Sequence, residues 1–164
     1  MWRTVEGMRW LQPMYDLLYF NTVPVSLEDI ASVATQEGYK VEHGQTECCG
    51  PYLEVYHGGM LYGGDTTHPQ LQRDRWIFDY TDVEAYDIED DWALVEAYRP
   101  ACFLSAQYHV GHLCDLTKFL RRLMDVYGGR VYGADNKIHD AATIERMQFI
   151  TGDGEVYLEC GNEQ

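Results

Sequence analysis

Basic residues are scarce in this chain, with 12 lysines and arginines against 27 aspartates and glutamates, for a formal net charge of −15. Such a field repels nucleic acids and anionic membranes, and it speeds encounters with basic partners. No stretch approaches the ~18 consecutive apolar residues of a membrane-spanning helix. We therefore expect no nucleic-acid partner and no membrane partner, and we expect a protein partner to present a basic surface.

The cysteines also do not match the pattern of a disulfide-rich protein. Their number is five, which is odd and fits poorly with a fully paired disulfide framework. The first 20 residues lack the uninterrupted apolar core of a secretion signal, because Glu6, Arg9 and Asp16 interrupt it. These observations lead us to expect a cytoplasmic protein with reduced thiols.

Two common ligand-binding motifs are missing as well. Residues 57–69, "HGGMLYGGDTTHP", contain glycines but lack the order of a phosphate-binding loop and its following Lys-Ser/Thr. Residues 79–91, "DYTDVEAYDIEDD", are rich in carboxylates but lack the spacing and the central glycine of a calcium loop.

What is present indicates one folded domain. The 164 residues are 46% apolar, enough to bury a core without metal or disulfides. The pattern over residues 15–46 predicts a β-α-β unit, with strands at 15–23 and 39–46. Ser26 begins the intervening helix, with Asp29 as its reciprocal capping partner, and Gly38 ends it.

A second β-α-β unit is predicted from a strand at 101–110, a helix at 113–127 and a strand at 130–133. The two units can be aligned, which places His112 at the position of Ser26. Both an ancient duplication and a chance similarity of two helix starts are open. Further strands, hairpins and turns are expected between and after these units: 52–57 with 60–63, 75–80, a short helix at 91–98, one helical turn at 139–146 and a terminal hairpin at 147–159. The fold class is therefore α+β, a single domain over 1–164, with a mixed or antiparallel sheet and helices packed on one face.

Metal-capable side chains are densest at "HVGHLCD", which holds His109, His112, Cys114 and Asp115. A structural zinc site needs four ligands, and the other pair would come from Cys48-Cys49, His57 or His68. A strand end and a helix cap account for the same residues without metal. We therefore expect no metal and no other cofactor.

Cys114 supports an alternative function. A thiol in the first turn of a helix has its pKa lowered by the helix dipole, and His112 beside it would add to that effect. The alternative is a small thiol-dependent enzyme or redox regulator that uses Cys114 and His112. The structural interpretation is that Cys114 is a small apolar residue of the core.

The acidic stretch that ends at Trp92 is the preferred partner-binding surface. Seven of its 13 residues from 79 to 91 are carboxylates, and large aromatic side chains alternate with them. Charged residues around aromatic anchors suit the docking of a basic protein. Trp92 could instead belong to the core. The predicted contact residues are Asp82, Glu84, Tyr86, Asp87, Glu89, Asp90, Asp91 and Trp92.

Small acidic α+β chains without a catalytic motif resemble the immunity proteins of bacterial polymorphic toxins, including effectors of type VI secretion. The strand-helix-"YGG"-strand segment from Phe103 to Tyr132 is similar to a module found in proteins encoded near such toxins. The resemblance implies a protein that is not an enzyme and that blocks the active site of a cognate toxin by direct binding.

Overall fold

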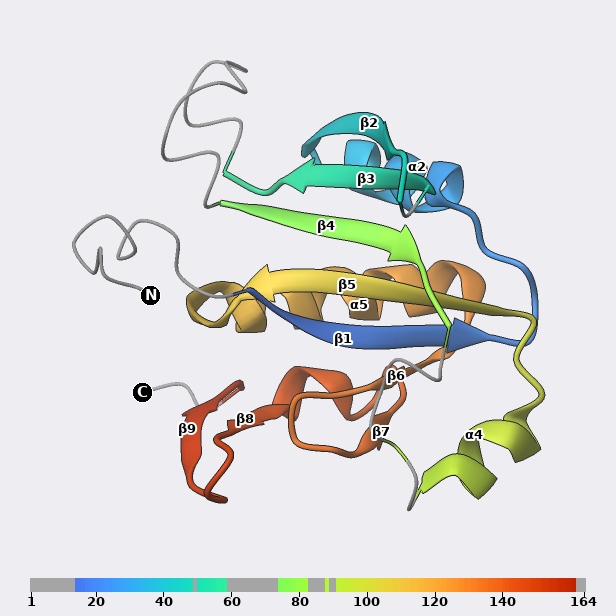
Figure 1. The fold of residues 1–164 in the computed structure, drawn as a ribbon. Helices are drawn as coiled ribbons and strands as arrows, with labels where there is room; N and C mark the ends of the chain where they lie inside the picture. Colours follow the sequence, from blue (N-terminus) through green and yellow to red (C-terminus); the bar gives the residue numbers. More distant parts are fainter. Residues whose placement is uncertain (1–13, 49, 59–73, 83–87, 89–90, 162–164) are drawn as a thin grey trace.

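The structure, a computed structural model of the chain, describes residues 14–48, 50–58, 74–82, 88 and 91–161. Within these ranges it is an α+β domain built on a seven-stranded antiparallel sheet (Figure 1). This architecture confirms the predicted fold class. None of the described helices is both long and apolar enough to cross a membrane.

The order of the strands in the main sheet is β2-β3-β4-β5-β1-β6-β7, and every neighbouring pair is antiparallel. A separate two-stranded hairpin, β8–β9, follows near the C-terminus. The strands are β1 (Met14–Asn21), β2 (Lys40–Thr46), β3 (Gly50–Tyr56), β4 (Arg75–Tyr80), β5 (Cys102–His109), β6 (Arg130–Tyr132), β7 (Ile138–His139), β8 (Gln148–Ile150) and β9 (Val156–Glu159).

Both predicted β-α-β units are present. Helix α2 (Leu27–Gln36) connects β1 to β2, and helix α5 (Leu113–Tyr127) connects β5 to β6. The antiparallel pairing makes each connected pair of strands parallel, but neither pair is adjacent. Strands β3, β4 and β5 separate β1 from β2, whereas only β1 separates β5 from β6. The first unit thus crosses more of the sheet than the second.

The two faces of the sheet carry different helices. Along β1, Leu17 and Tyr19 belong to the main core beneath α2 and α5, whereas Leu18 and Phe20 face the opposite side. The short helix α4 (Trp92–Tyr98) packs on that opposite side through Val95. The expectation that helices cover one face is therefore correct for α2 and α5 and wrong for α4.

Local sequence signals explain the start of α2. The Ser26 side chain accepts a hydrogen bond from the backbone N–H of Asp29, and the Asp29 carboxylate accepts one from the backbone N–H of Ser26. Gly38 follows the helix with a φ of 90°, a conformation that glycine adopts without steric cost. The capping box and the glycine stop are both confirmed.

The hairpin expected between residues 52–57 and 60–63 is not what determines the pairing of the first of these strands. Strand β3 pairs with β2 on one side and with β4 on the other, so it is an interior strand of the sheet. The predicted partner at residues 60–63 lies outside the described residues. The terminal hairpin and the helical turn before it (Ile144–Arg146) are confirmed, whereas β7 was not predicted.

Candidate functional site

The antiparallel order of β3, β4 and β5 brings histidines and carboxylates together at one end of these three strands. The end of β3 lies beside the start of β4, because Tyr56 pairs with Arg75. The end of β5 lies there as well, because Ile77 pairs with Gln107. Three segments that are distant in sequence thus meet at this end of the strands, and α5 begins beside them.

His57 is the first residue after β3, and its ring is held in place by Trp76. The two rings are stacked, with centroids 4.4 Å apart and planes 20° apart. The backbone N–H of His57 also donates to the carbonyl oxygen of Asp74, at 3.1 Å. Nε2 of His57 is buried and has no hydrogen-bond partner among the described residues. A buried polar group left in this state costs about 1–3 kcal/mol.

Burial sets the protonation state of His57. It lowers the pKa of the imidazole to about 4, with a further decrease from the nearby His112 that outweighs the opposing effect of Asp74. The ring of His57 is therefore neutral at neutral pH, with a lone pair on one of its nitrogens.

His112 closes the short 3₁₀ turn Val110–His112 and occupies the N-cap position of α5, as the alignment with Ser26 predicts. Its side chain, however, makes no capping hydrogen bond. Nε2 of His112 instead lies 3.2 Å from a carboxylate oxygen of Asp74, which is mostly buried just before β4. The explanation of His112 as a helix-capping side chain is therefore wrong.

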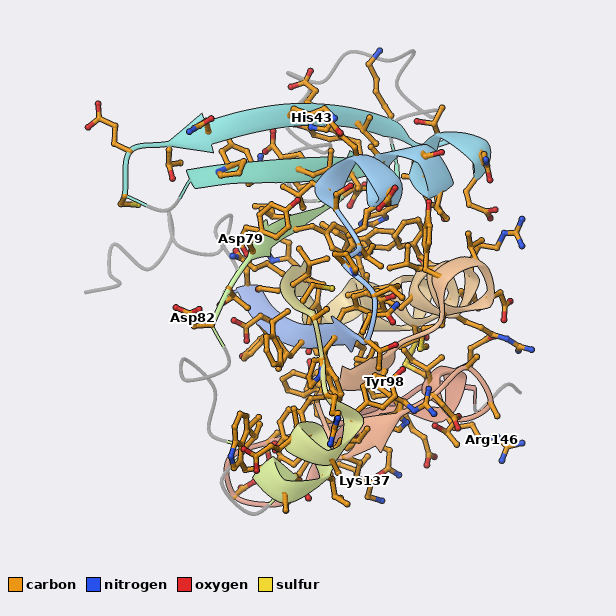
Figure 2. The ribbon with its side chains drawn as sticks, turned by 90° about the vertical axis from the view of Figure 1, so that its right-hand side faces the viewer. His43, Asp79, Asp82, Tyr98, Lys137 and Arg146 are labelled. Carbon is orange, nitrogen blue, oxygen red and sulfur yellow. A yellow bond between two sulfur atoms is a disulfide. The ribbon has the colours of Figure 1, made fainter. Side chains whose placement is uncertain are left out.

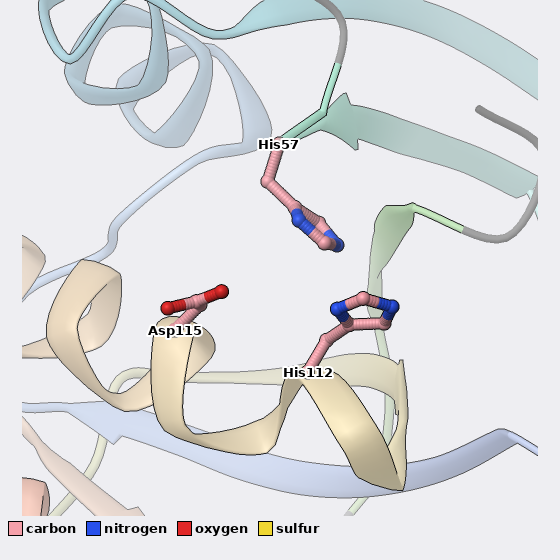
Figure 3. Close-up of side chains that lie close together, drawn as sticks. All are labelled: His57, His112 and Asp115. Atoms are coloured by element: carbon pink, nitrogen blue, oxygen red, sulfur yellow. The ribbon is translucent and has the colours of Figure 1, made fainter. Parts of the chain in front are cut away.

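Asp115 completes the group from the first turn of α5. His57, His112 and Asp115 each offer one nitrogen or oxygen atom, and these three atoms lie within 4.8 Å of one another (Figure 3). Both histidines are half-buried and Asp115 is exposed, so the group opens to solvent on the side of the carboxylate. We call His57, His112 and Asp115 the His-Asp cluster.

Cys114 does not join this cluster. It forms a disulfide with Cys160, and Cys102 is a free cysteine. Cys48 is also disulfide-bonded, so the expectation of reduced thiols is wrong for Cys48, Cys114 and Cys160. A thiolate at Cys114 would exist only after reduction, so the structure gives no support to its role as a nucleophile.

The acidic-aromatic stretch is described only in part. Glu84, Tyr86, Asp87, Glu89 and Asp90 lie outside the described residues. Asp82 is exposed and points outward (Figure 2), while Asp91 is half-buried at the N-cap of α4. Trp92 is 39% exposed, so it is not a core residue.

Helix α4 packs on the sheet and also exposes two large apolar side chains. Val95 is fully buried, and Tyr98 packs edge-on against Phe20 with centroids 5.5 Å apart. The guanidinium of Arg130 lies 5.0 Å from the centre of the Tyr98 ring. Of the apolar side chains of the helix that are not buried, Leu94 is 63% exposed and Trp92 is 39% exposed. We call Asp91, Trp92 and Leu94 the α4 surface.

Another buried polar group lies at the far edge of the sheet. Nε2 of His139 is 3.0 Å from both carboxylate oxygens of Asp135, and Nδ1 is 3.1 Å from the hydroxyl of Thr143. Burial acts to raise the pKa of Asp135, but the hydrogen bond and charge of His139 outweigh it and lower the pKa. Its polar atoms satisfy one another, so we assign this group a structural role.

A pocket of about 360 Å³ opens between the start of β1 and the β8–β9 hairpin. Its volume is within the range of small-molecule sites, but Asp16 is the only charged side chain among the residues that line it. We assign no ligand to it.

Sequence reasoning named His57 only as one of several possible zinc ligands, and it missed Asp74. Neither residue lies in a recognisable motif, because strand pairing brings them to the cluster. Comparisons with family models, curated proteins and solved structures find no match for this chain. The resemblance to immunity proteins therefore stays a prediction.

Proposed function

We propose that this protein is an immunity protein that binds a basic toxin through the α4 surface and blocks the active site of that toxin. The observation that carries the proposal is the pair of large apolar side chains on α4, with Trp92 39% and Leu94 63% exposed beside acidic residues. Tryptophan is among the residues that most often anchor protein interfaces.

The fixed inner side of α4 matters for this role. Val95, Tyr98 and Arg130 hold the helix against the sheet, so the α4 surface is preorganised. A preorganised anchor loses little conformational entropy on binding, and more of its contact energy therefore contributes to affinity.

The charge of the chain supports a basic partner. At a net charge of −15, the protein attracts a cationic surface over a distance and speeds the encounter. Asp82 and Asp91, the two predicted contact carboxylates that the structure describes, belong to the acidic stretch and contribute to this negative charge. In this account the carboxylates set the association rate, and Trp92 sets the dissociation rate.

The proposed compartment is the cytoplasm, where a cysteine pair is normally reduced. Cys114 and Cys160 are paired in the structure, so their redox state in living cells tests this part of the proposal. Alkylation of thiols in intact cells should label both cysteines in a cytoplasmic protein. Protection of both would place the protein in an oxidising compartment.

The test of function is protection of cells that express the toxin encoded directly upstream. The parent protein should protect, and Trp92→Ala should protect poorly. Tyr157→Ala is the matched control, because Tyr157 is an aromatic residue on β9 that is 67% exposed and lies outside the α4 surface. Equal protection by both variants would remove the α4 surface from the proposal.

A further inference from the structure

We propose that His57, His112 and Asp115 bind a divalent transition-metal ion of the zinc class, with Asp74 orienting the ring of His112. Imidazole nitrogens and carboxylate oxygens are the ligands that zinc takes in three-ligand sites. This proposal replaces the expectation of no metal, which rested on a strand end and a helix cap as the explanation of the residues from His109 to Asp115.

The spacing of the His-Asp cluster is close to that of a bound ion. Ligands about 2.0–2.1 Å from a tetrahedral zinc ion lie about 3.4 Å from one another. The three candidate atoms lie within 4.8 Å of one another. Asp115 is exposed, so its side chain is free to rotate toward the two imidazole rings without any change in the backbone.

His57 supplies an independent observation. Its Nε2 is buried and has no partner among the described residues, although buried polar atoms are nearly always satisfied. The stacking on Trp76 prevents the ring from turning freely to find one. The tilted ring of His112 lies 4.7 Å away between centroids, and Figure 3 shows the two rings and Asp115 turned toward a common centre. An ion coordinated by Nε2 of His57 would supply the missing partner.

Asp74 gives His112 the arrangement of a metal ligand. The carboxylate favours the tautomer with its proton on Nε2, at 3.2 Å, which leaves the lone pair on Nδ1. A histidine whose second ring nitrogen donates to a carboxylate is the usual arrangement in zinc sites, because the carboxylate fixes the ring and raises its basicity.

The His-Asp cluster differs from the structural site that was considered from sequence. That site required four ligands and included Cys114, whose sulfur is bonded to Cys160. Three protein ligands leave a coordination position for water, as in catalytic sites. The cluster also shares no residue with the α4 surface, so its test is separate from the test of toxin binding.

The experiment uses full-length, oxidised protein without a histidine tag, stripped of metal by a chelator that is then removed. Cobalt(II) is titrated and followed by its visible absorption, and zinc is then added to displace it. Metal content per chain is measured by elemental analysis. His43→Gln is the matched control, because His43 is exposed on the edge strand β2 and lies outside the cluster (Figure 2).

We expect one cobalt ion per chain in the parent and in His43→Gln, displaced by one zinc ion. His57→Gln and His112→Gln should lose this binding. Asp74→Asn should weaken the affinity by about 10- to 100-fold, the usual effect of removing such a carboxylate. Asp115→Asn should weaken metal binding without unfolding the protein, because Asp115 is exposed. This variant therefore tests the site even if a histidine variant unfolds.

Two results would overturn the site. One is a parent protein that binds neither metal. The other is binding that persists in folded His57→Gln, His112→Gln and Asp115→Asn at the affinity of His43→Gln.

Discussion

The Cys114–Cys160 disulfide should contribute a large share of the stability of the domain. It joins the first turn of α5 to the residue just after β9, across a sequence separation of 46. A cross-link of that length removes about 13–14 cal/mol/K from the entropy of the unfolded chain, or about 4 kcal/mol at room temperature. For a chain of this size, that corresponds to a decrease in Tm of about 8–16 °C.

The assay is urea and thermal unfolding of the parent and of Cys114→Ala/Cys160→Ala, each with and without reductant. Reductant alone is not selective, because Cys48 is also disulfide-bonded. Without reductant the double variant should be less stable by about 4 kcal/mol. With reductant the two proteins should unfold within about 1 kcal/mol of each other, the scale of an ordinary side-chain replacement. An equal difference in both conditions would show that the loss comes from packing, and would refute the cross-link argument.

Further predictions follow from the core, the helix cap and the buried polar group. Phe78→Ala should cost about 3–5 kcal/mol in urea unfolding, because the side chain is fully buried. Ser26→Ala should cost about 0.5–2 kcal/mol by the same measurement, through loss of the capping box. The pKa of Asp135 is lowered from 3.8 in the folded state, so its stabilising effect is present above that pH and is lost as the pH falls through the folded pKa. Asp135→Asn should therefore flatten the loss of stability in acid, and an unchanged pH profile would contradict the pairing with His139.

Local signals predicted most of the elements of the fold. The capping box at Ser26 and the glycine stop at Gly38 are short-range patterns, and each is readable within a few residues. The strand order was beyond such signals, because pairing between distant strands depends on how whole faces pack. Helix α4 shows the same limit, since its few residues gave no indication of which face of the sheet it would cover.

The candidate site was predictable only in part, for the same reason. Residues 109–115 were noted as metal-capable because their histidines, cysteine and carboxylate lie together in the sequence, although no metal was expected there. His57 and Asp74 reach them through the pairing of β3, β4 and β5, which local patterns do not encode. The disulfide was missed because the spacing of cysteines does not reveal their partners. Of the predicted contact residues, Asp82 and Trp92 are exposed and Asp91 is half-buried, and their contact with a partner stays a prediction.

The most direct test of the proposed function is the kinetics of binding to the toxin encoded directly upstream, measured with purified proteins over a range of salt concentrations. The parent should bind one to one, with an association rate that falls as salt rises. Trp92→Ala should raise the dissociation rate by about 30- to 1000-fold, equivalent to about 2–4 kcal/mol for an interface anchor. Tyr157→Ala should match the parent. Absence of binding by the parent, or equal dissociation rates for Trp92→Ala and Tyr157→Ala, would contradict the account.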